Sequence, residues 1–511
     1  MSEREWREAS DMRSPRVGLA LVLIAAIVLR YWGLSRGIPY AVGVDEPEIV
    51  ERALAMMRRG TLNPHFFDYG SLHIYIQLAV SVVRFIVGSV TGAWDSLAQA
   101  TSASFYLWGR AVTAAFGVAT VLLVYRIGMR WGSRHALLAA ALMAVMPLHV
   151  RYSHYVLTDT PLTFFVALSM LLALGAHERP VLRAFAFAGI AAGLAAAVKY
   201  NGGLALIMPL VACWMTPAAR PSRLACTMVT ICAATAAFLL AAPYTLLDLP
   251  GFLDRFASLS AEYRNGPPPP ETAAVLYLKH LRLQFGTPGM LLIGAGVVMG
   301  VIRAIRGPGR VTWTLTLAFT IPYFVMIAGQ RIIYARYALP IVPMLCLLAS
   351  AVVISGVSLL RRYQFPRGVR TALIVGLTLT LLVHPARVAV AFDRMISQRS
   401  TLDDAYAWMM ANIPADSMIV LEGGHLVLPS NYRSKRIPQL RQKTFQQYVD
   451  DKVDYLVASS QSYGPYMDDP REFRPEFNDY MTLFTHTEEL ARFTPGTGKP
   501  GPELRIFRVR R

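Results

Sequence analysis

Long apolar runs separated by short basic segments dominate this chain and constrain its fold more than any other feature. The first run is Val17–Leu34, and runs able to cross a hydrocarbon core of about 30 Å recur along most of the sequence. The chain is 54% hydrophobic and only 16% charged, which excludes an ordinary soluble globular protein. The sequence therefore predicts a polytopic α-helical membrane protein.

We expect eleven membrane spans. No small-residue cleavage site follows Val17–Leu34, so we interpret this run as a retained first span rather than as a removed signal peptide. The other spans are expected to begin near Phe105, His135, Pro161, Arg183, Asn201, Leu224, Pro288, Val311, Tyr337 and Val369.

The distribution of basic residues predicts the orientation of these spans. One further apolar stretch, Ser71–Val90, contains His73, Gln77 and Arg84, and we interpret it as an amphipathic helix in the membrane interface. With Ser71–Val90 outside the count, the Arg-rich loops fall on the same side as the basic tail, residues 1–16. Because Lys and Arg accumulate in cytoplasmic loops, we expect the N-terminus inside and the C-terminus outside.

This topology divides the chain into a short tail, a transmembrane domain and three large extracytoplasmic pieces. The transmembrane domain covers residues 17–392, and the outer pieces are a first loop (35–104), a second loop (244–286) and a C-terminal domain (393–511). The last of these has ordinary polarity. Its Thr401–Asp404 resembles a capping box before a helix that ends near Pro414. Strands are predicted at Ser417–Leu421, Val453–Ala458 and Arg505–Val509, which gives a small α/β domain.

The acidic residues are confined mostly to the outer loops, the tail and the C-terminal domain. Only Asp159 and Glu178 are acidic between residues 105 and 244. Asp45 and Glu46 follow the first span, and Asp159 opens a span just before a proline. An Asp at this position is also a common helix cap, and an acidic pair in a loop can simply be solvated. By the predicted topology, all three carboxylates lie at the outer face of the spans.

Four cations are expected to face these carboxylates from the same side. They are Arg110, Lys199, Arg331 and Arg336. An Arg at the end of a span can simply extend to the lipid headgroups. Cations on the outer side run against the positive-inside trend, however, and a phosphate or pyrophosphate held at the outer leaflet would explain them, because guanidinium groups bind such oxyanions through charge-assisted bonds.

Carboxylates opposite phosphate-binding cations indicate transfer of a sugar from a lipid-linked phosphate. Glycosyl transfer passes through an oxocarbenium-like state. The acceptor hydroxyl must lose its proton as it attacks, which suits a carboxylate general base. The departing lipid phosphate needs positive charge rather than a proton. We therefore expect one catalytic Asp and inversion at the anomeric carbon.

Several motifs, in this order and spacing, resemble the GT-C glycosyltransferases, specifically glycosyltransferase family 39. Members of that family include protein O-mannosyltransferases and lipid A aminoarabinose transferases. The motifs are Val44-Asp45-Glu46, Phe66 to Tyr75, His149 to His154 with Asp159 to Leu162, Ala197 to Gly202, and Arg336 to Pro340. The resemblance covers about residues 15–390, and it departs from the family at Gly70-Ser71, where relatives often carry two prolines.

The resemblance implies a GT-C fold of about 11 transmembrane helices with juxtamembrane helices. It also implies a polyprenyl-phosphate-linked sugar donor and a glycan, lipid or protein acceptor, with no nucleic-acid partner. The protein would lie in the cell inner (plasma) membrane, with its active site and C-terminal domain extracytoplasmic. In family members such an appended domain would help to select the acceptor.

The same resemblance implies residue roles. Asp45 would be the general base, Glu46 would orient the acceptor or donor, and Asp159 would be a secondary carboxylate of the site. The implied substrate-binding residues are Tyr69, His73, Tyr200 and Tyr337. No cofactor is certain. A divalent metal, which some GT-C enzymes use, would be held by Asp45, Glu46 and Asp159.

Two other classes of function compete with an enzyme. A lipid or glycan transporter or flippase would also be polytopic and basic, but transporters usually place ionisable residues near the middle of the membrane and show repeat symmetry. In this chain the centres of the predicted spans are nearly free of charge, and the acids lie in long outer loops. A structural or sensing membrane protein would leave those carboxylates unexplained. We therefore favour the glycosyltransferase.

Overall fold

The computed structural model describes most of the chain. The described residues are 3–38, 43, 45–100, 102–217, 221–266, 269–307, 309–423, 426, 428–429 and 431–510, with the side chains of 3–15, 102, 357–358 and 360–362 left aside. The motif residue Val44 lies outside this part. Two compact units form. The helical unit comprises 1–32, 48–99 and 108–392, and the α/β unit comprises 33–47, 100–107 and 393–511.

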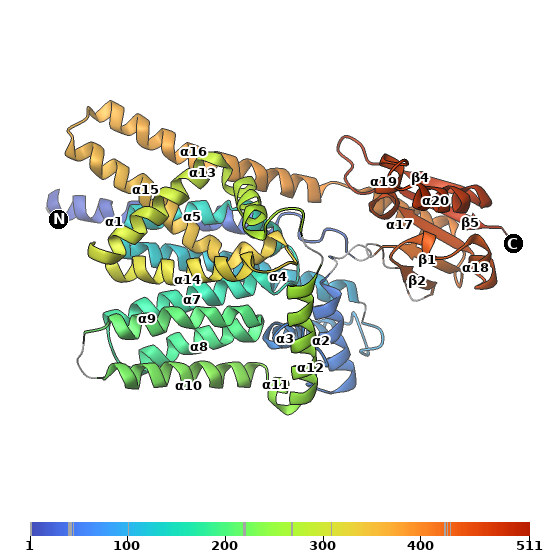
Figure 1. The fold of residues 1–511 in the computed structure, drawn as a ribbon, viewed down its shortest axis with the longest axis horizontal. Coiled ribbons are helices and arrows are strands. Elements are labelled where there is room, and N and C mark those ends of the chain that lie inside the picture. Colours follow the sequence, from blue (N-terminus) through green and yellow to red (C-terminus); the bar gives the residue numbers. More distant parts are fainter. Residues whose placement is uncertain are drawn as a thin grey trace. The chain divides into compact units, whose positions relative to one another are not determined.

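The helical unit is a bundle of long apolar helices (Figure 1). Its helices, some of which continue into the other unit at one end, are α1 (Glu3–Tyr31), α2 (Pro47–Arg59), α3 (Leu72–Val90), α4 (Ser102–Gly128), α5 (Ser133–Ala144), α6 (Pro147–Ser153), α7 (Asp159–Glu178), α8 (Leu182–Val198), α9 (Ile207–Met215), α10 (Arg223–Ala241), α11 (Tyr244–Leu247), α12 (Leu249–Asn265), α13 (Ala273–Arg306), α14 (Arg310–Ala328), α15 (Val342–Arg362) and α16 (Arg367–Ser397). Three 3₁₀ helices join them: η1 (Met129–Trp131), η2 (Tyr200–Leu206) and η3 (Ala335–Ile341).

Small residues allow close packing in this unit. Helix α8 packs against both α7 and α10 (Figure 1). Gly189 and Gly193, one helical turn apart on α8, face the backbone carbonyls of Thr230 and Ala234 on α10, and neither position has room for a Cβ atom. Glycines at this spacing are typical of membrane helices whose backbones approach closely.

Each of the eleven predicted spans falls on a helix or on a pair of joined helices, and the predicted fold class is confirmed. By length and apolar composition alone, eight segments of the described residues could cross a membrane, or nine if the pair α5 and α6 counts as one span. The segment α3, which we expected at the interface, is one of the eight.

Helix breaks explain why some predicted spans are not single straight helices. The span predicted to begin near His135 bends by 57° between α5 and α6, where Pro147 opens α6 and has no N–H to continue α5. The span predicted near Asn201 begins with the 3₁₀ helix η2, which contains Gly202 and Gly203. The length of an apolar run predicts that a span is present, but it does not predict where the backbone of that span changes direction.

The α/β unit contains a mixed five-stranded sheet with strand order β2-β1-β3-β5-β4. The strands are β1 (Met418–Glu422), β2 (Arg433–Ile437), β3 (Tyr455–Ser459), β4 (Thr487–Phe493) and β5 (Leu504–Val509), and the helices are α17 (Thr401–Asn412), α18 (Phe445–Asp450), α19 (Ser460–Asp468) and α20 (Arg474–His486), with the 3₁₀ helix η4 (Leu440–Gln442). Strand β1 pairs in parallel with β2 and β3, whereas β5 is antiparallel to β3 and β4.

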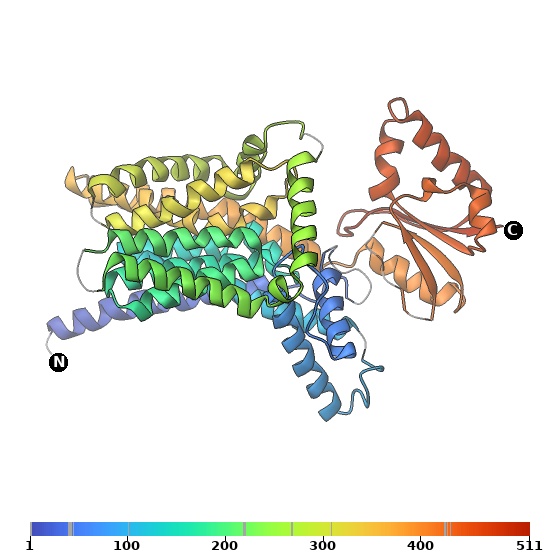
Figure 2. The ribbon, with the colours of Figure 1, turned by 60° about the horizontal axis from the view of Figure 1, so that its bottom comes forward.

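Both faces of this sheet are buried by helices (Figure 2). Alternate residues of β1 point to opposite faces, so Ile419 and Leu421 pack with α17, whereas Val420 packs in the cluster that contains α20. The three predicted strands coincide with β1, β3 and β5 to within two residues. The capping box begins one residue earlier than predicted, because Ser400 and Asp403 form it.

Candidate active site

Asp159 lies at the centre of a buried charged cluster in the helical unit. It is the first residue of α7, and the residue is only 2% exposed. Its Oδ1 accepts a hydrogen bond from Lys199 Nζ at 2.9 Å, and its Oδ2 lies 3.6 Å from Arg336 Nε. The structure therefore brings together three of the residues that the sequence placed on one side of the membrane.

Local backbone geometry carries these three side chains to one place. Lys199 lies between α8 and η2 in an extended conformation, and Arg336 lies in η3. The carboxylate of Asp159 does not cap α7, because Thr158 is the N-cap residue and makes no side-chain capping bond. A negative charge in the first turn of a helix is favoured by the helix dipole. The carboxylate is thus available to bind the two cations.

Aromatic rings surround the two cations. Lys199 Nζ lies 4.3 Å from the ring centre of Tyr337 and 5.7 Å from that of Tyr69. The guanidinium of Arg336 lies 4.5 Å from the ring centre of Tyr334. Such rings stabilise a cation without neutralising it. The phenols of Tyr337 and of Tyr263 from α12 are hydrogen-bonded to each other, and burial raises the pKa of Tyr263, so its hydroxyl stays protonated.

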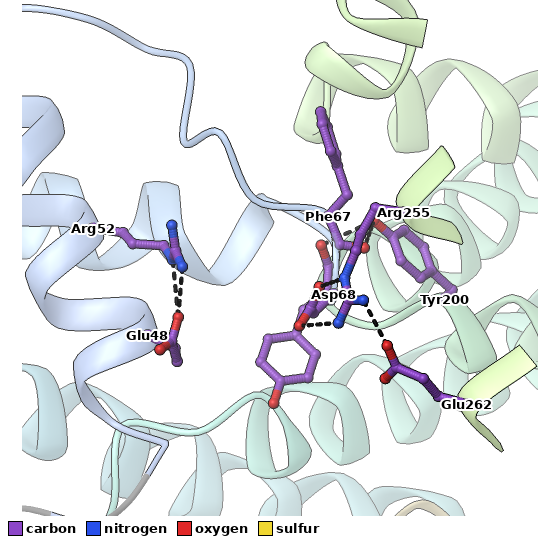
Figure 3. Close-up of polar contacts among 8 residues, drawn as sticks. Glu48, Arg52, Phe67, Asp68, Tyr200, Arg255 and Glu262 are labelled. Carbon is purple, nitrogen blue, oxygen red and sulfur yellow. Dashed lines mark hydrogen bonds and ion pairs between the residues drawn. The ribbon is translucent and has the colours of Figure 1, made fainter. Parts of the chain in front are cut away.

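The loop before α3 is fixed to the same region (Figure 3). Tyr200 donates its hydroxyl to the carbonyl oxygens of Phe67 and Tyr69, at 3.0 Å each. Arg255 of α12 forms an ion pair with Asp68 through Nε and Nη2, and a second pair with Glu262, with Nη1 to Oε1 at 2.8 Å. The substrate-binding candidates Tyr69 and Tyr200 are therefore held next to Lys199.

Gly70 explains how this loop can approach so closely. A Cβ atom at Gly70 would collide with the backbone carbonyl of Ala197, in the last turn of α8. This is the position at which the sequence departs from the family pattern. The glycine at position 70, where relatives often carry a proline, therefore lets the loop pack directly against the backbone of Ala197, two residues before Lys199.

The other predicted cations have different partners. Arg110 of α4 is 1% exposed, and its guanidinium lies 5.7 Å from the ring centre of Tyr155. Arg331 is exposed and donates from Nη1 to the carbonyl of Gly266 at 3.1 Å. No described contact links either guanidinium to Asp159. Their roles in binding the donor phosphate stay predictions.

His73 is buried without hydrogen bonds. It lies on α3 with no exposed surface, and neither ring nitrogen has a hydrogen-bond partner in the described structure. Buried polar groups are normally satisfied, so such a side chain has unused capacity for a ligand or a water molecule. Its predicted role in substrate binding stays a prediction.

Asp45 and Glu46 belong to the α/β unit. Glu46 is fully buried, and its Oε2 accepts a hydrogen bond from the Gly43 N–H at 2.6 Å, whereas Asp45 is half-buried. Because the two units are described separately, the meeting of Asp45 with Asp159 stays a prediction. In the described ranges, no group of three or more His, Cys, Asp or Glu side chains could hold a metal ion.

Sequence reasoning missed several residues that shape the site. Arg30 on α1 is fully buried and donates to the carbonyls of Met143 (3.1 Å) and Ala144 (2.9 Å), and it also contacts His149 Nδ1 at 2.9 Å. It thereby satisfies carbonyls released where α5 ends. An Arg inside the first apolar run was the available signal. Tyr263 and Arg255 gave no signal, because they lie on α12, a polar helix without a recognisable motif.

Comparison with solved structures identifies the fold. The chain is similar to the oligosaccharyltransferase of Archaeoglobus fulgidus, with a TM-score of 0.57 at 14% identity over 96% of this chain and 74% of that one. It is also similar to ArnT from Cupriavidus metallidurans, with a TM-score of 0.54 at 14% identity over 96% of this chain and 97% of that one. These likenesses show that the chain has the GT-C fold, which confirms the resemblance inferred from its motifs.

A sequence comparison points to the same class. The family model of dolichyl-phosphate-mannose-protein mannosyltransferases matches residues 75–256, which is less than half of the chain. No curated protein sequence matches significantly. The fold and the partial family match both point to the GT-C class of multi-pass membrane glycosyltransferases.

Proposed function

We propose that the protein transfers a sugar from a polyprenyl-phosphate donor to an acceptor hydroxyl on the extracytoplasmic face of the plasma membrane. The buried cluster around Asp159 is the observation that carries this proposal. One carboxylate is shared by two cations, Lys199 and Arg336. Two partly buried cations thus meet at one point, and ammonium and guanidinium groups bind phosphate oxygens through charge-assisted hydrogen bonds.

The phosphate of the donor is the anion that fits this cluster. As the bond between the anomeric carbon and the phosphate oxygen breaks, negative charge develops on the departing lipid phosphate. Lys199 and Arg336 stabilise that charge in a region with little water, where electrostatic interactions are strong. Asp159 acts as a positioning residue, because its two oxygens fix the directions of both cations.

The acceptor side of the reaction requires a base. We assign this role to Asp45, with Glu46 orienting the acceptor or donor. The carboxylate of Asp45 accepts the proton of the acceptor hydroxyl as the hydroxyl oxygen attacks the anomeric carbon from the face opposite the phosphate, which inverts the configuration. Support comes from the motif resemblance and from the position of both acids directly after the first span.

The solved relatives support the donor class. The oligosaccharyltransferase of Archaeoglobus fulgidus has been solved with an inhibitory peptide and a dolichol-phosphate, and ArnT from Cupriavidus metallidurans with undecaprenyl phosphate. Both ligands are phosphates on a long isoprenoid chain. We extend this class of donor to the present chain, with a protein, lipid or glycan as acceptor.

The orientation is supported by the two ends of α7. Asp159 opens this helix and Glu178 ends it, where Glu178 pairs with Arg130. The Arg-rich ends of α4 and α13 match the loops that the positive-inside rule places in the cytoplasm. The charged cluster would then open to the extracytoplasmic side.

Binding of undecaprenyl phosphate to the purified full-length protein tests the proposal. We expect Lys199→Gln and Arg336→Gln each to weaken binding about tenfold or more. The matched control is Arg264→Gln, an exposed Arg of α12 that donates to the carbonyl of Ser260 and should leave binding within twofold. Wild-type affinity in both cluster variants would overturn the phosphate assignment. Mass spectrometry of the glycoconjugates lost on deletion of the gene would then identify the sugar and the acceptor together.

A further inference from the structure

A groove in the helical unit lies far from the charged cluster. The groove has a volume of about 380 Å³ and is bordered by α4, α7 and α8, with Leu171, Leu172 and Gly175 of α7 among its lining residues. These residues belong to the last turns of α7, whereas Asp159 is its first residue. At a rise of 1.5 Å per residue, the groove lies roughly 20 Å along the helix from Asp159. It is therefore no part of the proposed active site.

The groove combines an apolar interior with one uncompensated charge. Arg130 at its edge is neutralised by Glu178, with Nε to Oε1 at 2.8 Å and Nη2 to Oε2 at 3.0 Å. Arg126, one helical turn earlier on α4, also lines the groove and is exposed. Over the described ranges, Arg126 forms no ion pair. The mouth of the groove thus carries a net positive charge.

The walls of the groove are open to the surroundings of the bundle. Phe187 of α8 lines it and is 57% exposed. A Cβ atom added at Gly175 would meet no other atom within 4 Å, so the space in front of this glycine is empty of protein. In a multi-pass membrane protein an apolar groove of this kind faces lipid chains, and a basic residue at its mouth faces lipid headgroups.

We infer that this groove binds an anionic glycerophospholipid. Its phosphate would contact the guanidinium of Arg126, and one acyl chain would lie along Leu171, Leu172 and Phe187. The charge of Arg126 favours an anionic headgroup such as that of phosphatidylglycerol over a zwitterionic one. In the proposed orientation the groove opens toward the cytoplasmic leaflet, so this lipid is distinct from the sugar donor and the inference goes beyond the proposed function.

Native mass spectrometry of the purified full-length protein with added phosphatidylglycerol tests the inference. Arg126→Gln should lower the bound phosphatidylglycerol about fivefold. Gly175→Leu should remove most of it, because the new side chain fills the groove. The matched controls are Arg134→Gln, an exposed Arg at the start of α5, and Gly294→Leu, an exposed glycine of α13 with open space around it. Both controls should bind as the wild type does.

Separate lipids distinguish the possible occupants. Phosphatidylcholine should bind more weakly than phosphatidylglycerol and should be insensitive to Arg126→Gln. If undecaprenyl phosphate is retained in place of phosphatidylglycerol and is lost in both groove variants, the phospholipid assignment is wrong. Wild-type binding of phosphatidylglycerol by Arg126→Gln also overturns it. Arg126 is exposed, so this variant remains informative even if Gly175→Leu does not fold.

Discussion

Two buried carboxylates, one in each unit, are held by different kinds of partner. Asp159 in the helical unit is bound by two cations, Lys199 and Arg336. Glu422 in the α/β unit is bound by neutral donors, the N–H groups of Leu440 (2.7 Å) and Ser459 (2.8 Å) and the hydroxyl of Tyr480 (2.5 Å). Both residues are nearly inaccessible, at 2% and 6% exposure.

We interpret the cluster around Asp159 as a binding site and the hydrogen bonds of Glu422 as structural contacts. The partners of Glu422 come from η4, β3 and α20, so the carboxylate joins these elements to β1, and its hydrogen-bonding capacity is used within the fold. At Asp159 the partners are two cations, which are groups that can bind the phosphate of an anionic ligand. We therefore expect changes at the first site to alter catalysis and changes at the second to alter stability.

The largest effect is expected at Asp45, the half-buried carboxylate that we propose as the base. Asp45→Asn keeps the size of the side chain but removes the base, so transfer should fall by about 10²-fold to 10⁴-fold. Binding of undecaprenyl phosphate should be unchanged. The measurement is the initial rate of sugar transfer, with Asp95→Asn, an exposed acid of the same outer loop, as control. Wild-type turnover in Asp45→Asn would exclude Asp45 as the base.

A large but smaller effect is expected at the cations of Asp159. Lys199→Met should lower the rate of transfer about 100-fold, because one group that stabilises the departing phosphate is lost. Arg264→Met, at an exposed Arg of α12 whose Nε donates to the carbonyl of Ser260, should change the rate less than twofold. Equal losses in the two variants would mean that Lys199 acts only through the general charge of the outer surface.

Glu422→Gln should affect the α/β unit without affecting transfer per folded molecule. In this variant an NH₂ group replaces one carboxylate oxygen, so a group that donates hydrogen bonds faces another donor. The free energy of unfolding of this unit should therefore fall by about 1–3 kcal/mol. Burial raises the pKa of Glu422 above its ordinary value of 4.5. The native state therefore binds the proton more tightly, and stability should decrease as pH rises from 4.5 through the native pKa.

Hydrogen exchange of the β1 and β3 amides in the full-length protein measures this effect. In the wild type, the protection of these amides from exchange should fall as pH rises across that range. In Glu422→Gln, this dependence of protection on pH should be lost. A loss of transfer that exceeds the loss of folded protein would contradict a purely structural role for Glu422.

The smallest effect is expected at Glu489 on the same sheet. Ion pairs with Arg492 and Arg505 lower the pKa of Glu489 from 4.5 to about 2. The stabilisation is present above pH 4.5 and is lost as pH falls toward 2, which is the opposite slope to that of Glu422. Because these groups are partly exposed, Glu489→Gln should cost less than about 1 kcal/mol. Acid unfolding monitored at β4 and β5 would check both the sign and the size.

Apolar length and charge distribution made the bundle predictable. Both patterns follow from the bilayer, so they are visible in the sequence without tertiary information. Strands β2 and β4 were invisible, because their sequences RSKRI and TEELARF are mostly polar and they lie at the two edges of the sheet. Pro147 marks the helix break before α6, but no local pattern indicates that Arg30 of a distant helix binds the carbonyls of Met143 and Ala144 at that break.

The charged cluster was predictable only in part. Topology placed Asp159, Lys199 and Arg336 on one side, but it could not select these two cations from the four on that side. The choice depends on where η2 and η3 begin, since each 3₁₀ helix fixes the direction of the cation next to it. The contribution of Tyr263 depends on the packing of α12, which no pattern in the sequence indicated.

The contact of Gly70 with the carbonyl of Ala197 has a mechanical consequence. Because no atom separates the two backbones, the outer loop cannot tilt without displacing the end of α8. A substrate that shifts Tyr69 would therefore also shift the strand-like segment that carries Lys199. Even an alanine at position 70 would force the two segments apart, so this glycine transmits movement between the surface of the protein and its buried charges.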